Sequence, residues 1–187
     1  MNTRALLFIP AVLVVALPLA YCAGTQTPSN DPLHQSQGRG KPQKDNREAA
    51  RLLKLAATQG NAEAQTKLGV LYGLGRGGLQ KDDSEAARLY KLAADQGNAI
   101  AQFNLGCFYS QGLGGLQKGD TEAARLYKLA ADRGHAQAQV NLGIFYWQGL
   151  GGLQKNEREG ARLFKLAADQ GHAEARSALK GIAPRAD

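Results

Sequence analysis

The sequence has few aromatic residues and almost no cysteine. Aromatic side chains make up 6% of its 187 residues, whereas glycine alone occurs 23 times. A β-sheet favours aromatic and β-branched residues, so this composition favours closely packed helices. Beyond Cys22 the only cysteine is Cys107. A lone thiol forms no disulfide within the chain, so the fold must depend on its own core.

The chain also lacks a segregated block of charge. Its formal net charge is +7, but basic and acidic residues alternate through most of the sequence. A protein that binds nucleic acid usually gathers its basic residues on one face or along one stripe. We therefore expect no nucleic-acid partner.

A long apolar run occurs at the N-terminus, over residues 5–20. It is short for a membrane span and is interrupted by Pro10 and Pro18. We interpret residues 1–22 as a signal peptide. This interpretation places the mature protein in the periplasm of a Gram-negative bacterium, with secretion as the alternative.

The end of this segment leaves two kinds of processing open. Residues 19–22, Leu-Ala-Tyr-Cys, are similar to the lipobox of bacterial lipoproteins, in which the cysteine carries the lipid. Tyr21 departs from that pattern, which has a small residue before the cysteine. Cys22 is thus the candidate for lipidation, and ordinary cleavage after Cys22 is the alternative. A lipid anchor would be the only membrane contact.

Residues 23–44 are rich in threonine, glutamine, serine, proline and glycine and contain very few apolar residues. Such a segment buries too little surface to offset the entropy lost on ordering. We expect a disordered tether here and a folded domain over residues 45–187.

That domain repeats one unit with a period of 37 residues. The pattern Gly-x-Ala-x-Ala starts at Gly60, Gly97, Gly134 and Gly171, and Lys-Leu-Ala-Ala starts at Lys54, Lys91, Lys128 and Lys165. Repetition of this kind marks an array in which each unit is buried by its neighbours.

Each unit is predicted to contain two helices. The first begins after the glycine of Gly-x-Ala-x-Ala, and the next residue, asparagine or histidine, holds the cap position. The second begins near Asp45, Asp82, Gly119 and Asn156, with a glutamate three residues later at capping-box spacing. An arginine follows each of these glutamates by three residues, which favours local ion pairs on a solvated face.

The last unit departs from the pattern. Gly69, Gly106 and Gly143 occupy positions where a helix backbone is expected to approach its partner closely, but the equivalent residue is Lys180. We expect residues 172–187 to form a C-terminal cap whose outer face meets water. About eight helices should form the array in total.

Several features resemble the Sel1-like repeat family, a branch of the tetratricopeptide superfamily. They are Leu105-Gly106 followed by Tyr109, the glycine-rich loops over residues 112–118 and 149–155, and the segment 122–132, Glu-Ala-Ala-Arg-Leu-Tyr-Lys-Leu-Ala-Ala-Asp. The resemblance covers residues 45–182. It implies an all-α solenoid of antiparallel helix pairs whose members bind other proteins.

The resemblance also suggests roles for an exported protein of this size. Members include adaptors for envelope assembly or virulence, secreted factors that meet a host, and immunity proteins that neutralise phospholipase effectors of type VI secretion. These roles follow from the family, not from any residue here.

In tetratricopeptide-like folds, one face of the first helix of each unit lines a concave groove. On that face the residues differ between units, whereas the opposite face keeps alanine, leucine and tyrosine at fixed positions. The predicted groove consists of Ile100, Phe103, Asn104, Cys107, Gln137, Val140, Asn141, Ile144, Trp147 and Gln148. Trp147 and Phe103 are the candidate anchors for a partner, with packing against the next unit as the alternative for both.

No motif points to catalysis or to a cofactor. The glycine-rich loops lack the lysine and hydroxyl residue of a phosphate-binding loop and recur in every internal unit. His135 and His172 alternate with asparagine at the cap position, which favours a capping role over metal binding. We expect neither an enzyme nor a bound metal or cofactor.

Overall fold

The structure, a computed structural model, describes residues 42–182. Over this range the chain forms eight helices and no strand, which confirms the all-α prediction. The helices are α3 (Pro42–Thr58), α4 (Ala62–Leu74), α5 (Asp83–Asp95), α6 (Ala99–Gln111), α7 (Asp120–Asp132), α8 (Ala136–Gln148), α9 (Glu157–Asp169) and α10 (Ala173–Ile182). We call α4, α6, α8 and α10 the A helices, and α3, α5, α7 and α9 the B helices.

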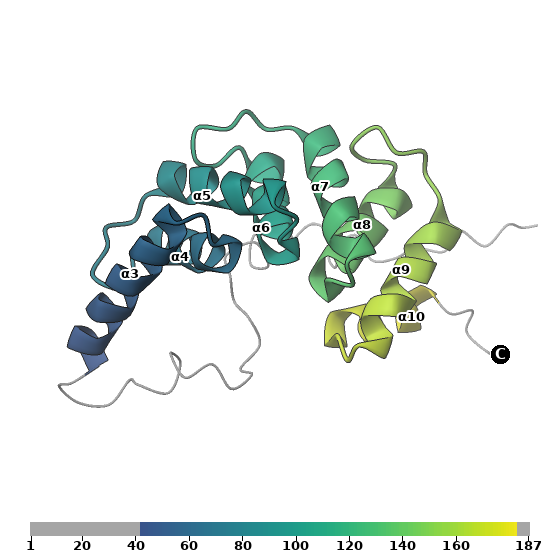
Figure 1. Cartoon of the computed structure of the whole chain (residues 1–187). Helices are drawn as coiled ribbons and strands as arrows, with labels where there is room; N and C mark the ends of the chain where they lie inside the picture. Colours follow the sequence, from purple (N-terminus) through teal and green to yellow (C-terminus); the bar gives the residue numbers. More distant parts are fainter. Residues whose placement is uncertain (1–41, 183–187) are drawn as a thin grey trace, which may run out of the picture.

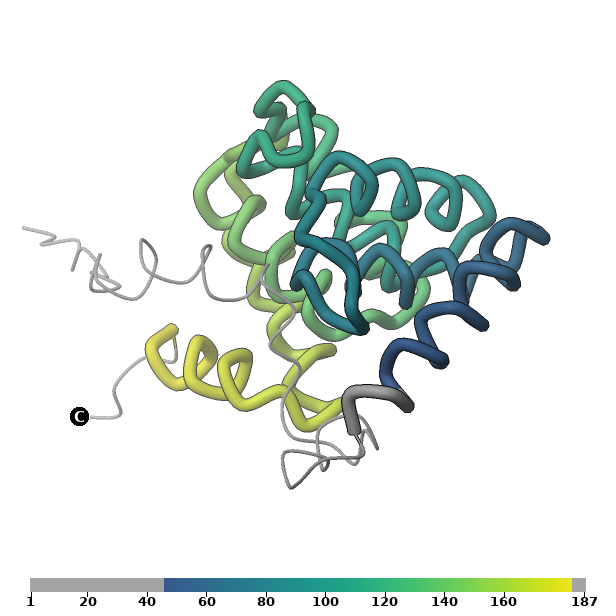
Figure 2. The backbone as a smooth tube through the Cα atoms, turned by 90° about the vertical axis from the view of Figure 1, so that its left-hand side faces the viewer, coloured from purple at the N-terminus to yellow at the C-terminus, as the bar shows by residue number. Residues whose placement is uncertain are grey.

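The helices follow one another in an arch, as the repeat predicts for a solenoid (Figure 1). Each internal A helix packs most extensively against the B helix that follows it. In Figure 1, α4 and α6 lie beneath α5, towards the inner side of the bend. Figure 2 shows the same bend from the side, with α3 and α10 below the middle units. No helix within residues 42–182 has the length and apolarity needed to cross a membrane.

The array begins slightly earlier than the sequence indicates. Helix α3 starts at Pro42, so residues 42–44 are helical and do not belong to the predicted tether. Proline is favoured in the first turn of a helix, because its fixed φ suits that turn and its missing N–H is not needed there. The predicted signal peptide, Cys22 and the rest of the tether lie outside the described residues.

Side chains cap most helices where the sequence indicates. Asn61, Asn98 and His135 each accept the backbone N–H three residues later, at the starts of α4, α6 and α8. Asp82 and Asn156 do the same for α5 and α9. Such a cap typically contributes about 1 kcal/mol.

At α5, however, only one of the two hydrogen bonds of a capping box forms, the bond from the Glu85 N–H to the Asp82 side chain. The N–H of Asp82 donates to the backbone oxygen of Tyr72 at 3.0 Å, so the reciprocal bond from Glu85 is not made. The Glu85 carboxylate pairs with Arg88 at 2.7 Å instead, and this pair lowers the pKa of Glu85. The same glutamate–arginine pair recurs in every B helix, as predicted.

Helix A approaches helix B at the repeated glycine of each internal unit. A Cβ on Gly106 would lie 2.8 Å from Cε1 of Tyr127, a ring that is 1% exposed. Gly69 meets Tyr90 and Gly143 meets Phe164 in the same way. The equivalent Lys180 is exposed on α10, as a polar outer face on the last unit requires.

Candidate protein-binding surface

The A helices carry a partly exposed stripe that runs from unit to unit and has no charge in the second and third units. Ile100 is 42% exposed, and Gln148 is also exposed. We call the stripe the A face; its members in these two units are Ile100, Asn104, Gln137, Asn141, Ile144 and Gln148. All six belong to the predicted groove. Amides and branched aliphatic residues suit contacts with a protein surface better than contacts with an anion.

Three other predicted groove residues are buried, so placing them on the groove surface was wrong. Phe103 is 6% exposed, Val140 5% and Cys107 0%. At about 100° per residue, they lie at one edge of the predicted stripe. Phe103 and Cys107 lie in a core cluster with Tyr127 of α7 and with Leu142 and Phe145 of α8 in the following unit. Val140 lies in another cluster, with Phe164 of α9 and Ala175 of α10.

The Phe103 ring stacks on His135, the cap residue of the next unit. The ring centroids are 4.8 Å apart and the planes are inclined by 23°. Burial of the imidazole, with a smaller contribution from His172, lowers the pKa of His135 to about 4. The ring is therefore neutral at physiological pH, and its Nδ1 accepts the N–H of Ala138 at 3.2 Å.

Trp147 packs against α9 and is only partly exposed. A Cβ on Gly160 would lie 3.3 Å from Cε3 of Trp147 and 2.9 Å from the backbone oxygen of Gly143. The other internal units pair a small residue with alanine here, Gly73 with Ala86 and Ser110 with Ala123. Trp147 and Gly160 are thus complementary, and Trp147 has a packing role beside any contact with a partner.

This complementarity predicts a measurable coupling. Gly160→Ala alone should lower the free energy of unfolding by about 1–3 kcal/mol, because the new Cβ overpacks the α8–α9 interface. Gly160→Ala combined with Trp147→Ser, which recreates the pair of the second unit, should lose less than the sum of the two single variants. Urea unfolding of the four proteins measures the coupling. Simple additivity would contradict the paired packing.

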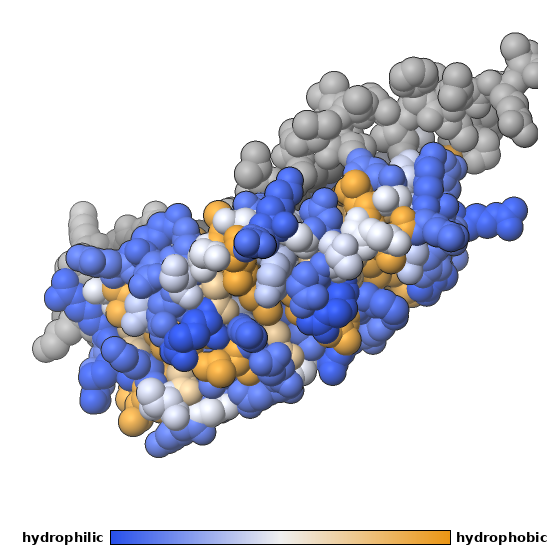
Figure 3. Space-filling model, turned by 90° about the horizontal axis from the view of Figure 1, so that it is seen from above, coloured by the Kyte–Doolittle hydropathy of each residue, from blue (hydrophilic) through white to orange (hydrophobic). Residues whose placement is uncertain are grey.

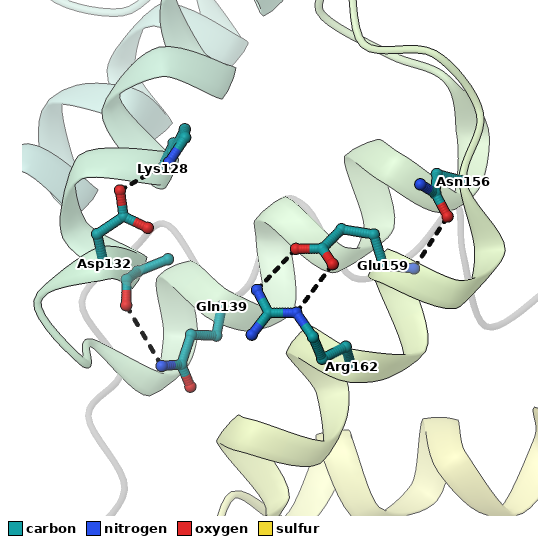
Figure 4. A network of polar contacts seen from close by, with 7 residues as sticks. Lys128, Asp132, Gln139, Asn156, Glu159 and Arg162 are labelled. Atoms are coloured by element: carbon teal, nitrogen blue, oxygen red, sulfur yellow. Dashed lines mark hydrogen bonds and ion pairs between the residues drawn. The ribbon is translucent and has the colours of Figure 1, made fainter.

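A row of buried glutamines, absent from the sequence prediction, ties each internal A helix to the preceding B helix. The Nε2 groups of Gln65, Gln102 and Gln139 donate to backbone oxygens of Ala57, Ala94 and Ala131 at 3.2, 3.2 and 3.4 Å. Figure 4 shows Gln139 in this position, below Lys128 and Asp132. The recurrence of glutamine at a 37-residue interval was the signal that could have identified the row.

Two of these glutamines have a second partner at the end of the next B helix. Gln96 donates to Oε1 of Gln65 at 2.8 Å, and Gln170 donates to Oε1 of Gln139 at 2.9 Å. In the middle unit the equivalent residue is Arg133, which donates to the backbone oxygen of Leu129 instead.

A cavity of about 290 Å³ opens at that place, between α5 and α7 with α6 as its floor. We call it the α5–α7 cleft. Its polar lining includes Lys91, Asp95, Gln102, Glu122, Arg125 and Arg133. Seen from above the arch, hydrophilic residues dominate the surface, with smaller apolar areas between them (Figure 3).

The described part of the chain offers no group of three or more His, Cys, Asp or Glu residues that could hold a metal ion. The buried Cys107 lies 3.6 Å from the Tyr127 hydroxyl, which donates towards its sulfur. The A face presents amides and aliphatic side chains, and the α5–α7 cleft presents charged and amide side chains.

The sequence matches the Sel1 repeat family four times in succession, at residues 33–61, 62–98, 99–135 and 136–172. No curated protein matches it significantly.

Solved structures show the same fold. One is c5321, described as a protective antigen of uropathogenic Escherichia coli that displays an SLR fold; it is 31% identical, with a TM-score of 0.67. A Sel1 repeat protein from Oxalobacter formigenes is 34% identical, with a TM-score of 0.63. The alignments cover 76% and 72% of this chain but only 31% and 58% of those chains. Helicobacter pylori cysteine rich protein B is 22% identical at a TM-score of 0.56, with coverage of 76% of this chain and 100% of that chain, and supports the fold alone.

Proposed function

The chain belongs to the Sel1 repeat family, and from that premise we propose that it is a non-catalytic module that captures a partner protein on the A face. Proteins of this family generally mediate protein–protein interactions and are typically scaffolds without catalytic activity. The observation that carries the proposal is the A face itself, a partly exposed and uncharged surface in which Ile100 and Gln148 are the most accessible side chains.

The first unit provides a natural control for this surface. At the positions of Ile100 and Asn104 it has Glu63 and Lys67, which form an ion pair at 2.7 Å. The substitutions Ile100→Glu and Asn104→Lys therefore place on α6 a pair that α4 already tolerates.

We expect the Ile100→Glu/Asn104→Lys variant to bind its partner at least about tenfold more weakly, a loss of about 1.4 kcal/mol. Two charges would then have to be desolvated at the interface. Stability should stay within about 0.5 kcal/mol, because both sites are at the surface. The measurement is affinity capture from an envelope fraction, followed by titration calorimetry with the captured protein. Arg158→Gln, at the exposed start of α9, is the control. Equal capture by both variants would place the binding surface elsewhere.

We further propose that the module works in the bacterial envelope, released by cleavage of residues 1–22 or anchored by a lipid on Cys22. The apolar run and the cysteine that follows it support this proposal. Cell fractionation of the wild type and of Cys22→Ser distinguishes the two alternatives. If Cys22 carries a lipid, the wild type is in the membrane fraction and Cys22→Ser is in the soluble fraction. If residues 1–22 are simply cleaved, both proteins are soluble. Recovery of both proteins in the cytoplasm would rule out export.

An immunity protein against a type VI phospholipase effector is one form such a module could take, and an envelope or virulence adaptor is the other. The short array and the predicted N-terminal tether favour the first. Its loss should be lethal only in cells that also carry the toxin, whereas an adaptor should bind several envelope proteins. Growth of a deletion strain with and without the neighbouring gene distinguishes them.

A further inference from the structure

The α5–α7 cleft contains a buried acceptor for which the rest of the described chain provides no donor. Gln102 is 3% exposed, and its Oε1 has no hydrogen-bond partner within residues 42–182. Leaving such a buried acceptor unpaired lowers the stability of the fold, because its bond to water is lost and not replaced. Its Nε2 is held by the backbone oxygen of Ala94 at 3.2 Å, so the side chain has little freedom to turn the oxygen elsewhere.

The neighbouring units show what this acceptor takes. In both flanking units the equivalent oxygen receives the Nε2 of a glutamine, from Gln96 or from Gln170. In the middle unit Arg133 replaces that glutamine, and its Nη1 donates to the backbone oxygen of Leu129 at 3.2 Å. Its Nη2 lies beside Gly97, only 3.1 Å from where a Cβ would stand. The replacement thus removes the internal amide donor and places a guanidinium at the cleft.

The cleft has a net positive lining. The charged residues facing it from α5 and α7 are Lys91, Asp95, Glu122, Arg125 and Arg133, three basic and two acidic. Glu122 is paired with Arg125. Neither Lys91 nor Arg133 makes an ion pair with another described residue, whereas the equivalent Lys128 in the next unit pairs with Asp132 at 2.8 Å. An anionic group entering the cleft would therefore meet basic side chains not already committed to an ion pair.

This surface is separate from the A face. On α6, Gln102 and Tyr109 line the cleft, whereas Ile100 and Asn104 belong to the A face. At about 100° per residue these two pairs lie on opposite sides of the helix. A ligand in the cleft therefore does not compete with a partner on the A face.

We propose that the α5–α7 cleft is a binding site for an extended peptide segment of a partner protein, one that carries an asparagine or glutamine side chain next to an acidic residue. The carboxamide of the peptide donates to Oε1 of Gln102, as Gln96 and Gln170 do in the flanking units. The carboxylate lies against Arg133 and Lys91. A polypeptide is the occupant because the same acceptor is filled by glutamine side chains of the polypeptide itself on both sides.

The probe is the capped dipeptide acetyl-Gln-Asp-amide, titrated into the ¹⁵N-labelled protein and followed by NMR. We expect saturable shifts in the side-chain amide of Gln102, the Nε–H of Arg133 and backbone amides of the cleft, and no shift at Ile100. Acetyl-Glu-Asp-amide lacks the carboxamide, and acetyl-Gln-Asn-amide lacks the carboxylate. Each should bind at least fivefold more weakly.

Arg133→Gln is the decisive variant, because it restores the residue type found in the flanking units. We expect it to bind the probe at least tenfold more weakly while melting at a temperature no lower than that of the wild type, since the introduced carboxamide can donate to Oε1 of Gln102. Arg158→Gln removes the same charge at an exposed site and should bind as the wild type does. Ile100→Glu/Asn104→Lys should also bind normally, so a failure here is distinguishable from a failure of the A face.

Three results would overturn the proposal. One is unchanged binding by Arg133→Gln, and another is a set of shifts that is scattered or does not saturate. The third is tighter binding of free L-glutamine than of the capped dipeptide, which would assign the cleft to a small molecule.

Discussion

Replacing Phe103 by alanine should lower the free energy of unfolding by about 3–5 kcal/mol, the usual cost of removing a buried phenylalanine. The ring is 6% exposed and lies in one cluster with Tyr127 and Phe145. It also stacks on His135, so its removal leaves a cavity at the junction of the second and third units. Urea unfolding followed by circular dichroism measures the loss.

Two variants make this result interpretable. Phe103→Val introduces the residue that the next unit has at the same position, Val140, and should lose less, because part of the cavity is filled. Ile100→Glu, one turn away on the same helix, should change stability by no more than about 0.5 kcal/mol. A Phe103→Ala protein as stable as the wild type but defective in binding would restore Phe103 to the groove and contradict the burial of its ring.

The scaffold could be predicted from the sequence because its signals are local and repeated. The 37-residue period, the caps at Asn61 and Asn98, and the glycine at Gly106 each follow from one physical requirement that recurs in every internal unit. The structure confirms these features. The start of α3 was misplaced by a few residues because a proline in the first helical turn looks, in sequence, like part of a linker.

The binding surface could be predicted only in part, because variation between units has two causes. A residue differs between units when it meets a ligand, but also when it matches a different neighbour. Phe103 packs on His135 and Trp147 packs against Gly160, so both residues have a neighbour within the protein to match. Helical periodicity identifies the side of α6 that varies, but it does not show how much of that side the next unit covers.

Buried polar residues are a second limit. Gln102 reads as an ordinary surface glutamine, and its burial becomes evident only when α5, α6 and α7 are assembled. The comparison between units still carried information, because Arg133 interrupts a series that has glutamine at Gln59, Gln96 and Gln170. The replacement by Arg133 is meaningful only once its counterpart, Gln102, is known, and only the structure shows that these glutamines pair in the flanking units.

Acidification should destabilise the protein through His135 before its carboxylates are protonated. The pKa of this histidine is about 4 in the folded chain, below its ordinary value near 6.5, chiefly because the ring is buried. The folded state therefore disfavours the charged ring, and the stability due to the neutral form is complete above about pH 6.5. It decreases as the pH falls from 6.5 towards 4. The expected loss of stability is on the order of 2 kcal/mol. This figure already allows for the partial exposure of the ring, which weakens the effect of burial.

The physical reason is specific to the site. Protonation at Nδ1 would remove the acceptor for the N–H of Ala138 and would place a charge against the Phe103 ring in the core. His172, whose pKa is also lowered by burial, lies close enough to His135 to disfavour a second positive charge. The two histidines should therefore act in the same direction.

His135→Asn tests this directly, because Asn61 and Asn98 cap α4 and α6 without titrating. Urea unfolding between pH 7 and pH 4 should show a steep loss of stability in the wild type, a shallower one in His135→Asn, and the shallowest in His135→Asn/His172→Asn. The glutamates paired with arginine are present in all three proteins, so they contribute equally to each curve. Their pKa values are lowered, so their contribution to stability is lost only at the acidic end of the range. Parallel curves for the wild type and His135→Asn would show that the imidazole is protonated without cost, and its contact with Phe103 would then have to open in solution.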